Sequence, residues 1–220
     1  MDASLAAAQS HLRSLTVRPF LPRYFPGYGI YWWLDADTWV QESYALDLYL
    51  AAAEQGSLAI TPELDRAYRI RQEIWTWRFD RLKRYHGAEA AEALFSNNYC
   101  NAGVFALRAD APHWARWAHW FRQGLAATDG KLVCDQTALN QAIRADQLKV
   151  NPLPAVCNWL CHCALPAYDR AAEGFYEPYF PHARIGILHL TGDSKNQSVQ
   201  WSDARGGVFS TSLRAPAAAD

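Results

Sequence analysis

Two aspartates one residue apart are the first residues whose types and spacing can do chemistry. Asp35 and Asp37 follow an apolar run, residues 30–34, which predicts a buried strand. Ligand sites in open α/β sheets lie past the carboxyl ends of strands, and side chains at i and i+2 project from one face. Two such carboxylates can hold a hard divalent cation that keeps positions open for phosphate oxygens. An Asp-x-Asp pair alone is more often a solvated surface feature than a metal site. Further residues of the chain are therefore needed to distinguish the two interpretations.

Two further polar clusters stand where predicted elements begin. Asn101 and Gly103 open a predicted strand, where the glycine allows close backbone approach and the amide can serve a hydroxyl-rich ligand. Asp135 and Gln136 open a predicted helix, with Asp135 as its expected N-cap. Together the two clusters offer one carboxylate and two amide groups that can serve a hydroxyl-rich ligand.

The last cluster follows an apolar strand near the C-terminus. His189, Gly192 and Lys195 supply an imidazole, a glycine and an ammonium group within seven residues. These groups suit a metal and a phosphate, with the histidine as ligand, the glycine for close approach and the lysine as a point charge.

Composition limits the class of protein that can carry these clusters. The 220 residues suit one domain, and 50% hydrophobic against 20% charged residues supports a real core. The net charge of −1 without a basic block argues against nucleic acid as a partner. No stretch approaches membrane-spanning length, and the N-terminus lacks the pattern of a secretory signal. Five cysteines without framework spacing predict a reducing, cytoplasmic setting, with peripheral attachment to the inner face of the membrane as a further option.

Predicted strands alternate with predicted helices along the chain, which indicates the α/β class. The expected helices cover residues 3–15, 42–55, 64–86, 112–126 and 135–145, and the expected strands cover residues 30–35, 57–60, 101–107 and 184–190. Within the helix over 64–86, Ile70, Ile74, Trp77 and Arg81 fall at helical spacing, which favours packing over function for that face. The spacing of Cys157, Cys161 and Cys163 is not a standard zinc pattern.

Taken in order, the polar clusters resemble the retaining, nucleotide-sugar-dependent glycosyltransferases of family 8, which include glycogenin and bacterial lipopolysaccharide galactosyl- and glucosyltransferases. The matching pieces are Thr16-Val-Arg18, Asp35-x-Asp37, Asn101-x-Gly103, Asp135-Gln136 and His189-x-x-Gly192-x-x-Lys195. The resemblance implies the GT-A fold, a Rossmann-like mixed sheet flanked by helices. It implies a single domain over residues 1–203, followed by a flexible tail over residues 204–220.

The resemblance also implies a role for each matched residue. Asp35, Asp37 and His189 would hold Mn²⁺ or Mg²⁺ on the diphosphate of the donor. The donor-binding residues would be Arg18, Asp35, Ala36, Asp37, Asn101, Gly103, Asp135, Gln136, Gly192 and Lys195. Asp135 and Gln136 are the catalytic candidates, although neither is named as a nucleophile. Asn158 and Trp159 would lie near the acceptor.

The chain also departs from that family. Family members place a longer segment before the Asp-x-Asp, so part of the nucleotide-binding half is expected to be missing, either by truncation or because the protein is naturally short. A sheet edge at residues 30–34 would then be uncovered and drive self-association. The leading function is metal-dependent transfer of a hexose, from a UDP-linked sugar, to a glycan or glycolipid with retention. The alternative is a non-catalytic remnant that binds metal and sugar without turnover, and a zinc-dependent hydrolase is a remote third.

Overall fold

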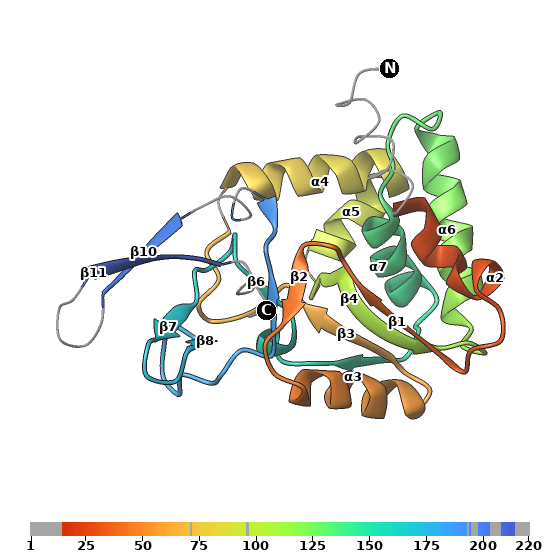
Figure 1. Cartoon of the computed structure of the whole chain (residues 1–220). Helices are drawn as coiled ribbons and strands as arrows, with labels where there is room; N and C mark the ends of the chain where they lie inside the picture. The colour runs from red at the N-terminus through yellow and green to blue at the C-terminus, as the bar shows by residue number, and fades with distance from the viewer. Residues whose placement is uncertain are drawn as a thin grey trace, which may run out of the picture.

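Four strands form the central sheet of the computed structural model, which describes residues 15–70, 72–95, 97–192, 194, 198–202 and 208–213 (Figure 1). They are β1 (Ile30–Leu34), β4 (Cys100–Arg108), β3 (Leu58–Pro62) and β5 (Val150–Pro152), in that spatial order. The strands β3 and β5 pair in parallel, whereas β4 runs antiparallel to both β1 and β3. The last residues of β1 and β3 therefore meet the first residues of β4 at one end of the sheet.

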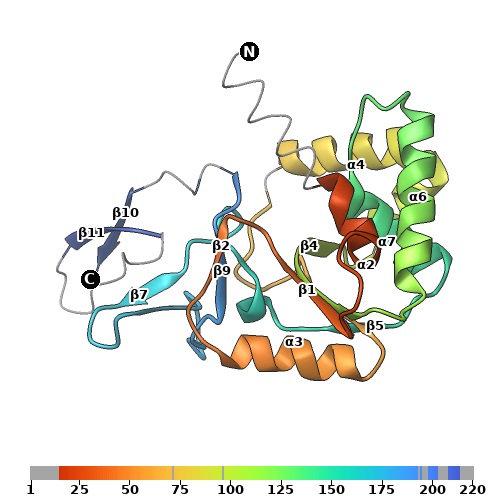
Figure 2. The same cartoon turned by 45° about the vertical axis from the view of Figure 1, so that its right-hand side comes forward.

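Helices cover both faces of this sheet, which confirms the predicted α/β class with a mixed sheet (Figures 1 and 2). The helix α3 (Tyr44–Glu54) lies on one face, where Ala59 and Ala106 present small side chains to it. On the other face, Leu58 and Ile60 share a core with side chains of α4, α6 and α7. These helices are α4 (Gln72–His86), α6 (His113–Ala127) and α7 (Asp135–Ala145), and α5 (Ala88–Phe95) packs against α4.

A smaller sheet stands beside the first and is built from three short strands. They are β2 (Thr38–Val40), β9 (Ile187–His189) and β6 (Trp159–Leu160), in that order. The pairing of β2 with β9 is antiparallel and sets Thr38 opposite His189. The remaining elements are η1 (Arg18–Phe20), α2 (Leu21–Tyr24), η2 (Ala155–Cys157) and the two hairpins β7 (Ala167–Asp169) with β8 (Gly174–Tyr176) and β10 (Ser198–Ser202) with β11 (Val208–Ser212).

Several predicted boundaries differ from the structure. The helix expected over 64–86 begins only at Gln72, because the Asp65 side chain closes a turn by accepting the Ala67 N–H at 2.8 Å. Cys134, rather than Asp135, is the N-cap of α7. The strand expected over 184–190 is limited to β9. The helix expected over 3–15 lies almost entirely outside the described residues.

Part of the segment expected as a flexible tail forms β11. Directly after it, the Leu213 side chain is fully buried, and the Leu213 carbonyl accepts the Trp39 indole N–H at 2.8 Å. None of the helices in the described part of the chain combines the length and apolar character needed to cross a membrane.

Candidate functional site

Asp35 and Asp37 lie in the turn that joins the two sheets. The Asp35 N–H donates to the Gly103 carbonyl at 2.7 Å, which extends the pairing of β1 with β4 by one residue. The Asp35 carbonyl then accepts the Thr38 N–H at 3.0 Å and the Thr38 hydroxyl at 2.7 Å. This tight turn sends the chain directly into β2, so both carboxylates stay at the end of β1.

His189 reaches the aspartates because β9 pairs with β2. Its Nε2 lies 3.3 Å from Asp37 Oδ1 and 3.8 Å from Asp35 Oδ2. One ligand atom from each of these three residues lies within 4.8 Å of the other two. The structure therefore brings together Asp35, Asp37 and His189, the three residues that the resemblance named as metal ligands, and they form the metal group of the candidate site. In the part of the chain that the structure describes, no other three His, Cys, Asp or Glu side chains lie this close together. The three cysteines Cys157, Cys161 and Cys163 do not form such a group either.

The donor set fits a hard divalent cation. Two carboxylates and one imidazole suit Mn²⁺ or Mg²⁺, which take oxygen ligands and accept a histidine. The backbone at Gly103 lies directly against this group. A Cβ at that position would lie 2.2 Å from His189 Cε1 and 2.9 Å from Asp35 Oδ2. Only a glycine therefore leaves the histidine and the aspartate in place.

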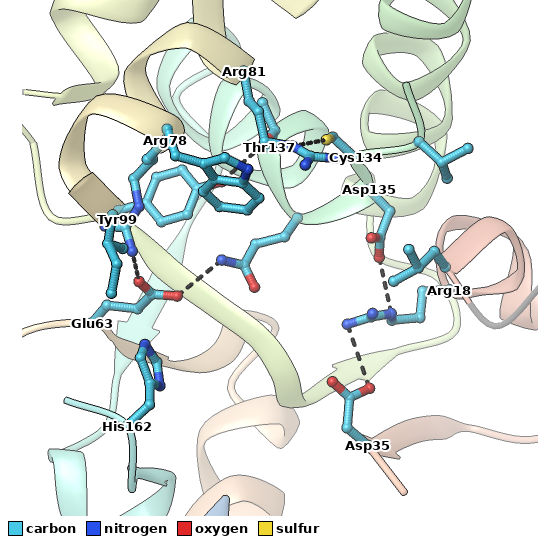
Figure 3. A pocket seen from close by; sticks show the side chains of 15 residues that line it. Arg18, Asp35, Glu63, Arg78, Arg81, Tyr99, Cys134, Asp135, Thr137 and His162 are labelled. Carbon is cyan, nitrogen blue, oxygen red and sulfur yellow. Dashed lines mark hydrogen bonds and ion pairs between the residues drawn. The ribbon is translucent and has the colours of Figure 1, made fainter. Parts of the chain in front are cut away.

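Arg18 joins Asp35 to Asp135 (Figure 3). Its Nε lies 2.9 Å from Asp135 Oδ2, and its Nη1 lies 3.6 Å from Asp35 Oδ1. The same Nη1 donates to the Ala102 carbonyl at 2.8 Å, and the arginine is only 5% exposed. Asp35 also accepts the Trp33 indole N–H at 2.7 Å. Arg18 thus separates two acidic groups that would otherwise repel each other.

Asp135 is the most strongly perturbed acid beside the metal group. It is the first residue of α7 and is 2% exposed. Burial raises the pKa of Asp135 to about 6, the Arg18 charge opposes that rise, and the Asp35 charge adds to it. A carboxyl group with a pKa in this range changes protonation close to neutral pH, as catalytic acids and bases do.

Glu63 is a site residue that the sequence analysis missed. Its Oε1 accepts the side-chain amides of Asn101 and Gln136, each at 2.9 Å. Its Oε2 pairs with the Arg78 guanidinium (Figure 3). Arg78 lies 4.8 Å from the ring centre of Tyr99. A signal for Glu63 exists in the sequence, because it follows β3 directly, as Asp35 follows β1.

Two asparagines connect Glu63 to the metal group. Asn101 Oδ1 accepts the Gly103 N–H at 2.9 Å and the Asn158 Nδ2 at 3.0 Å. Asn158 Oδ1 lies 3.0 Å from His189 Nδ1. Asn101 and Asn158 are buried, so these contacts are made inside the protein.

A cavity of about 390 Å³ opens beside these groups. Asp35, Glu63, Asp135 and Gln136 contribute polar groups to its wall, while α4 and the start of α7 contribute apolar ones. On α4, the apolar and aromatic groups come from the face that the sequence analysis assigned to packing, which includes Ile74, Trp77 and Arg81. That assignment is wrong for these three residues, which border the cavity, whereas Ile70 packs against the core as predicted.

Trp77 is the most exposed aromatic side chain on this wall. Its side chain is 56% exposed, and the Arg81 guanidinium lies 4.5 Å from its ring centre. Arg81 is held in turn by Cys134, whose sulfur accepts the Arg81 Nε–H at 3.2 Å. His162 lines the same cavity from the loop after β6 (Figure 3).

The remaining predicted site residues differ in how far they are exposed. Asn158 and Trp159, expected near the acceptor, are both fully buried, and the Trp159 indole N–H donates to the Ala164 carbonyl at 2.9 Å. Neither side chain is open to an acceptor, so we assign both to the interior. Ala36 and Gly192 are exposed, and Gly192 has a φ of +60°. Lys195 lies outside the described residues.

No protein-family model and no curated protein matches the chain. Among solved structures, the chain is similar to the galactosyltransferase LgtC, whose crystal structure is in complex with donor and acceptor sugar analogues. The two share 17% sequence identity with a TM-score of 0.47, over 81% of this chain and 58% of that one. The chain thus spans less than two thirds of the length of that galactosyltransferase.

Proposed function

We propose that this protein is a metal-dependent glycosyltransferase of GT-A type. It would move a hexose from a nucleotide sugar, most simply a UDP-linked one, to a glycan or glycolipid acceptor with retention. The observation that carries the proposal is the meeting of Asp35, Asp37 and His189 at the end of the sheet, beside a cavity with acidic, amide and aromatic groups in its wall.

Asp35, Asp37 and His189 would hold Mn²⁺ or Mg²⁺ next to the donor diphosphate. A bound cation supplies charge stabilisation for a diphosphate leaving group. Of the residues that the resemblance gives to the donor, Arg18 lies close to Asp35, and Lys195 and Gly192 follow β9 in sequence. Lys195 would add a point charge to the phosphate oxygens.

Asp135 and Gln136 would face the hexose of the donor. Positive charge develops at the anomeric carbon during glycosyl transfer, and a nearby carboxylate stabilises it. Arg18 fixes the orientation of the Asp135 carboxylate, while the Gln136 amide is fixed by Glu63 and by the Ala102 N–H at 2.9 Å. These contacts preorganise both side chains before a substrate binds.

The acceptor would bind against the α4 wall of the cavity. An exposed indole such as that of Trp77 offers a flat apolar surface, which suits the apolar face of a sugar ring. His162 and Glu63 supply hydrogen-bonding groups on the same cavity. This arrangement replaces Asn158 and Trp159, whose side chains are buried, with residues that a sugar can reach.

The test is to titrate Mn²⁺ and UDP into the wild-type protein and into the variants Asp37→Asn and His189→Ala by calorimetry. We expect both variants to lose Mn²⁺-dependent UDP binding while their circular dichroism stays unchanged. Asp80→Asn is the matched control, because Asp80 is exposed on α4 and its loss changes the net charge equally. UDP release from a panel of UDP-sugars then measures turnover. Wild-type affinity in both site variants would contradict the metal assignment.

A second candidate function, binding of a nucleotide sugar without turnover, is favoured by one observation. The groups expected to contact the donor sugar already have protein partners, since Asn101 contacts Glu63, Gly103 and Asn158, and Asp135 pairs with Arg18. Mn²⁺-dependent binding of a UDP-sugar without UDP release, with or without acceptor saccharides, would select this function over transfer.

A further inference from the structure

A continuous chain of buried hydrogen bonds runs from Glu63 to His189. Its links are Glu63 to Asn101 at 2.9 Å, Asn101 to Asn158 at 3.0 Å and Asn158 to His189 at 3.0 Å. Asn158 is fully buried and His189 is 3% exposed, so water cannot readily replace the two links that Asn158 makes, whereas the Glu63 end of the chain borders the cavity. The four residues come from the end of β3, the start of β4, the loop after η2 and the end of β9.

The direction of each hydrogen bond in this chain is fixed by its chemistry. The Gly103 N–H can only donate, so the Asn101 atom that faces it must be the amide oxygen. The Glu63 carboxylate, paired with the Arg78 guanidinium, accepts, so it must face the Asn101 amide nitrogen. Two independent anchors therefore give the same orientation for the Asn101 side chain.

The orientation of Asn101 sets the next two links. Asn101 Oδ1 accepts, so Asn158 must present its Nδ2 to it and its Oδ1 to His189. An amide oxygen accepts only, and His189 Nδ1 must therefore carry a hydrogen. In the neutral ring, Nε2 then keeps its lone pair, and Nε2 is the atom that lies beside Asp35 and Asp37.

We propose that Glu63 is a positioning residue that, through Asn101 and Asn158, fixes His189 in the tautomer that can bind a metal. The proposal rests on the proposed function for its metal, but the tautomer itself is a property of the metal-free protein. Partners of the non-ligating nitrogen of a metal-bound histidine tune the site, and their loss typically weakens metal affinity about 10- to 100-fold.

The variant Glu63→Gln tests the anchor without changing side-chain volume. The buried Arg78 guanidinium draws the glutamine oxygen toward itself, because a charge-assisted hydrogen bond is stronger than a neutral one. The new amide nitrogen then faces Asn101 as a donor, and Asn101 can accept from it only by turning away from the Gly103 N–H, so the turned orientation and the original one compete. A turned Asn101 turns Asn158 as well, which presents an N–H to His189 Nδ1 and favours the hydrogen on Nε2.

A double variant can restore the chain. In Glu63→Gln with Asn101→Asp, the glutamine N–H donates to one oxygen of the aspartate. The other oxygen still accepts from Gly103 and Asn158, as the amide oxygen does in the wild type. The hydrogen bonds from residue 101 through Asn158 to His189 regain their wild-type direction. The hydrogen bond between residue 63 and Gln136 is not restored.

Two measurements are made on the full chain. Nitrogen-15 NMR of the metal-free protein, recorded at alkaline pH, reports the tautomer. His189 is identified as the imidazole signal that disappears in His189→Ala. Calorimetry with MnCl₂ alone reports metal affinity. The matched control is Tyr49→Phe, which removes the buried hydroxyl that contacts Thr61 on β3 at 2.9 Å, outside the chain of hydrogen bonds.

We expect Nδ1–H in the wild type and in Tyr49→Phe, a population of Nε2–H in Glu63→Gln, and a return to Nδ1–H in the double variant. Mn²⁺ affinity should fall at least about tenfold in Glu63→Gln and recover in the double variant. An Nε2–H tautomer in the wild type, an unchanged tautomer in Glu63→Gln, or a double variant no better than Glu63→Gln overturns the proposal. If the tautomers behave as expected but the wild type binds no Mn²⁺, the proposed function fails while the positioning role stands.

Discussion

Gly103 is the residue on which the metal group depends most directly. A Cβ there would overlap His189 and the Asp35 carboxylate. We expect Gly103→Ala to lower the free energy of unfolding by about 1–3 kcal/mol, because overpacking forces neighbouring side chains to shift. Mn²⁺ affinity should fall as well, because the imidazole is displaced from the aspartates. Denaturant unfolding and calorimetry measure the two effects.

Gly29→Ala is the control for Gly103→Ala, because a Cβ at Gly29 would meet nothing within 4 Å. It should leave both quantities unchanged. Wild-type Mn²⁺ affinity in Gly103→Ala would show that His189 is not needed in its present position.

Asp135 makes the free energy of unfolding of the protein depend on pH in a predictable way. Its pKa of about 6 lies above the value of about 4 for an aspartate in an unfolded chain. The stability that comes from proton binding is therefore fully present below pH ~4 and is lost as the pH rises through about 6. We expect the free energy of unfolding of the wild type, relative to Asp135→Asn, to fall over this range by at most about 3 kcal/mol.

Urea unfolding of both proteins at several pH values measures this difference. The Arg18–Asp135 ion pair exists only while Asp135 is ionised, so its effect is already contained in the pKa of Asp135 and in the difference that is measured. Asp80→Asn controls for net charge. A difference between wild type and Asp135→Asn that stays constant from pH ~4 to ~7 would show that the folded protein does not raise this pKa.

The residues of the metal group were easier to predict from the sequence than the residues that hold them in position, such as Glu63. Asp35, Asp37 and His189 were recognisable because each follows an apolar run and matches a known order of motifs. Glu63 also follows a strand, but it stands in a Thr-Pro-Glu-Leu-Asp stretch that resembles the start of a helix. Its partners depend on the register of β4 against β3, which shifts between Ile60 and Thr61, and no single-sequence pattern reports such a shift.

Among the elements, α4 shows that helical spacing alone does not distinguish a core face from a cavity wall. Trp77 on α4 is mostly exposed, whereas Trp117 on α6 is fully buried. We expect Trp77→Ala to change the free energy of unfolding by less than about 1 kcal/mol, because surface substitutions are mild. Trp117→Ala should cost about 3–5 kcal/mol.

The same pair of variants tests the acceptor wall. Trp77→Ala should raise the KM for an acceptor saccharide while the affinity for Mn²⁺ and UDP stays unchanged. If Trp77→Ala lowers the free energy of unfolding as much as Trp117→Ala does, this face of α4 packs in the core and does not form the acceptor wall.

Among the long elements α4 and α5 were predicted poorly, and among the short strands of the second sheet only β9 lies within a predicted strand. The strand β1 and the helices α3, α6 and α7 have clear apolar patterns and end near their expected residues. The strands of the second sheet have two or three residues each, which is too short for a period to be read. They exist because they pair with one another, and that pairing is what places His189.

At the scale of the whole molecule, β1 is the outer strand of the central sheet. In the described part of the chain it pairs with β4 alone. An outer strand presents backbone N–H and carbonyl groups on its open side, which favours pairing with another chain. We expect residues 1–220 to self-associate as concentration rises, and size-exclusion chromatography with light scattering measures this. A single monomeric species at every concentration would contradict the expectation.

The turn from Asp35 to Thr38 is the shortest of the covalent connections between the four-stranded and the three-stranded sheet, and His189 reaches it from the three-stranded sheet. A cation held there would tie the end of β1 to the end of β9, two segments far apart in sequence. Motion of one sheet relative to the other would then require the cation to dissociate. Amide hydrogen exchange in β2 and β9 should accordingly slow when Mn²⁺ is added, while exchange in α3, which packs away from this joint, keeps its rate.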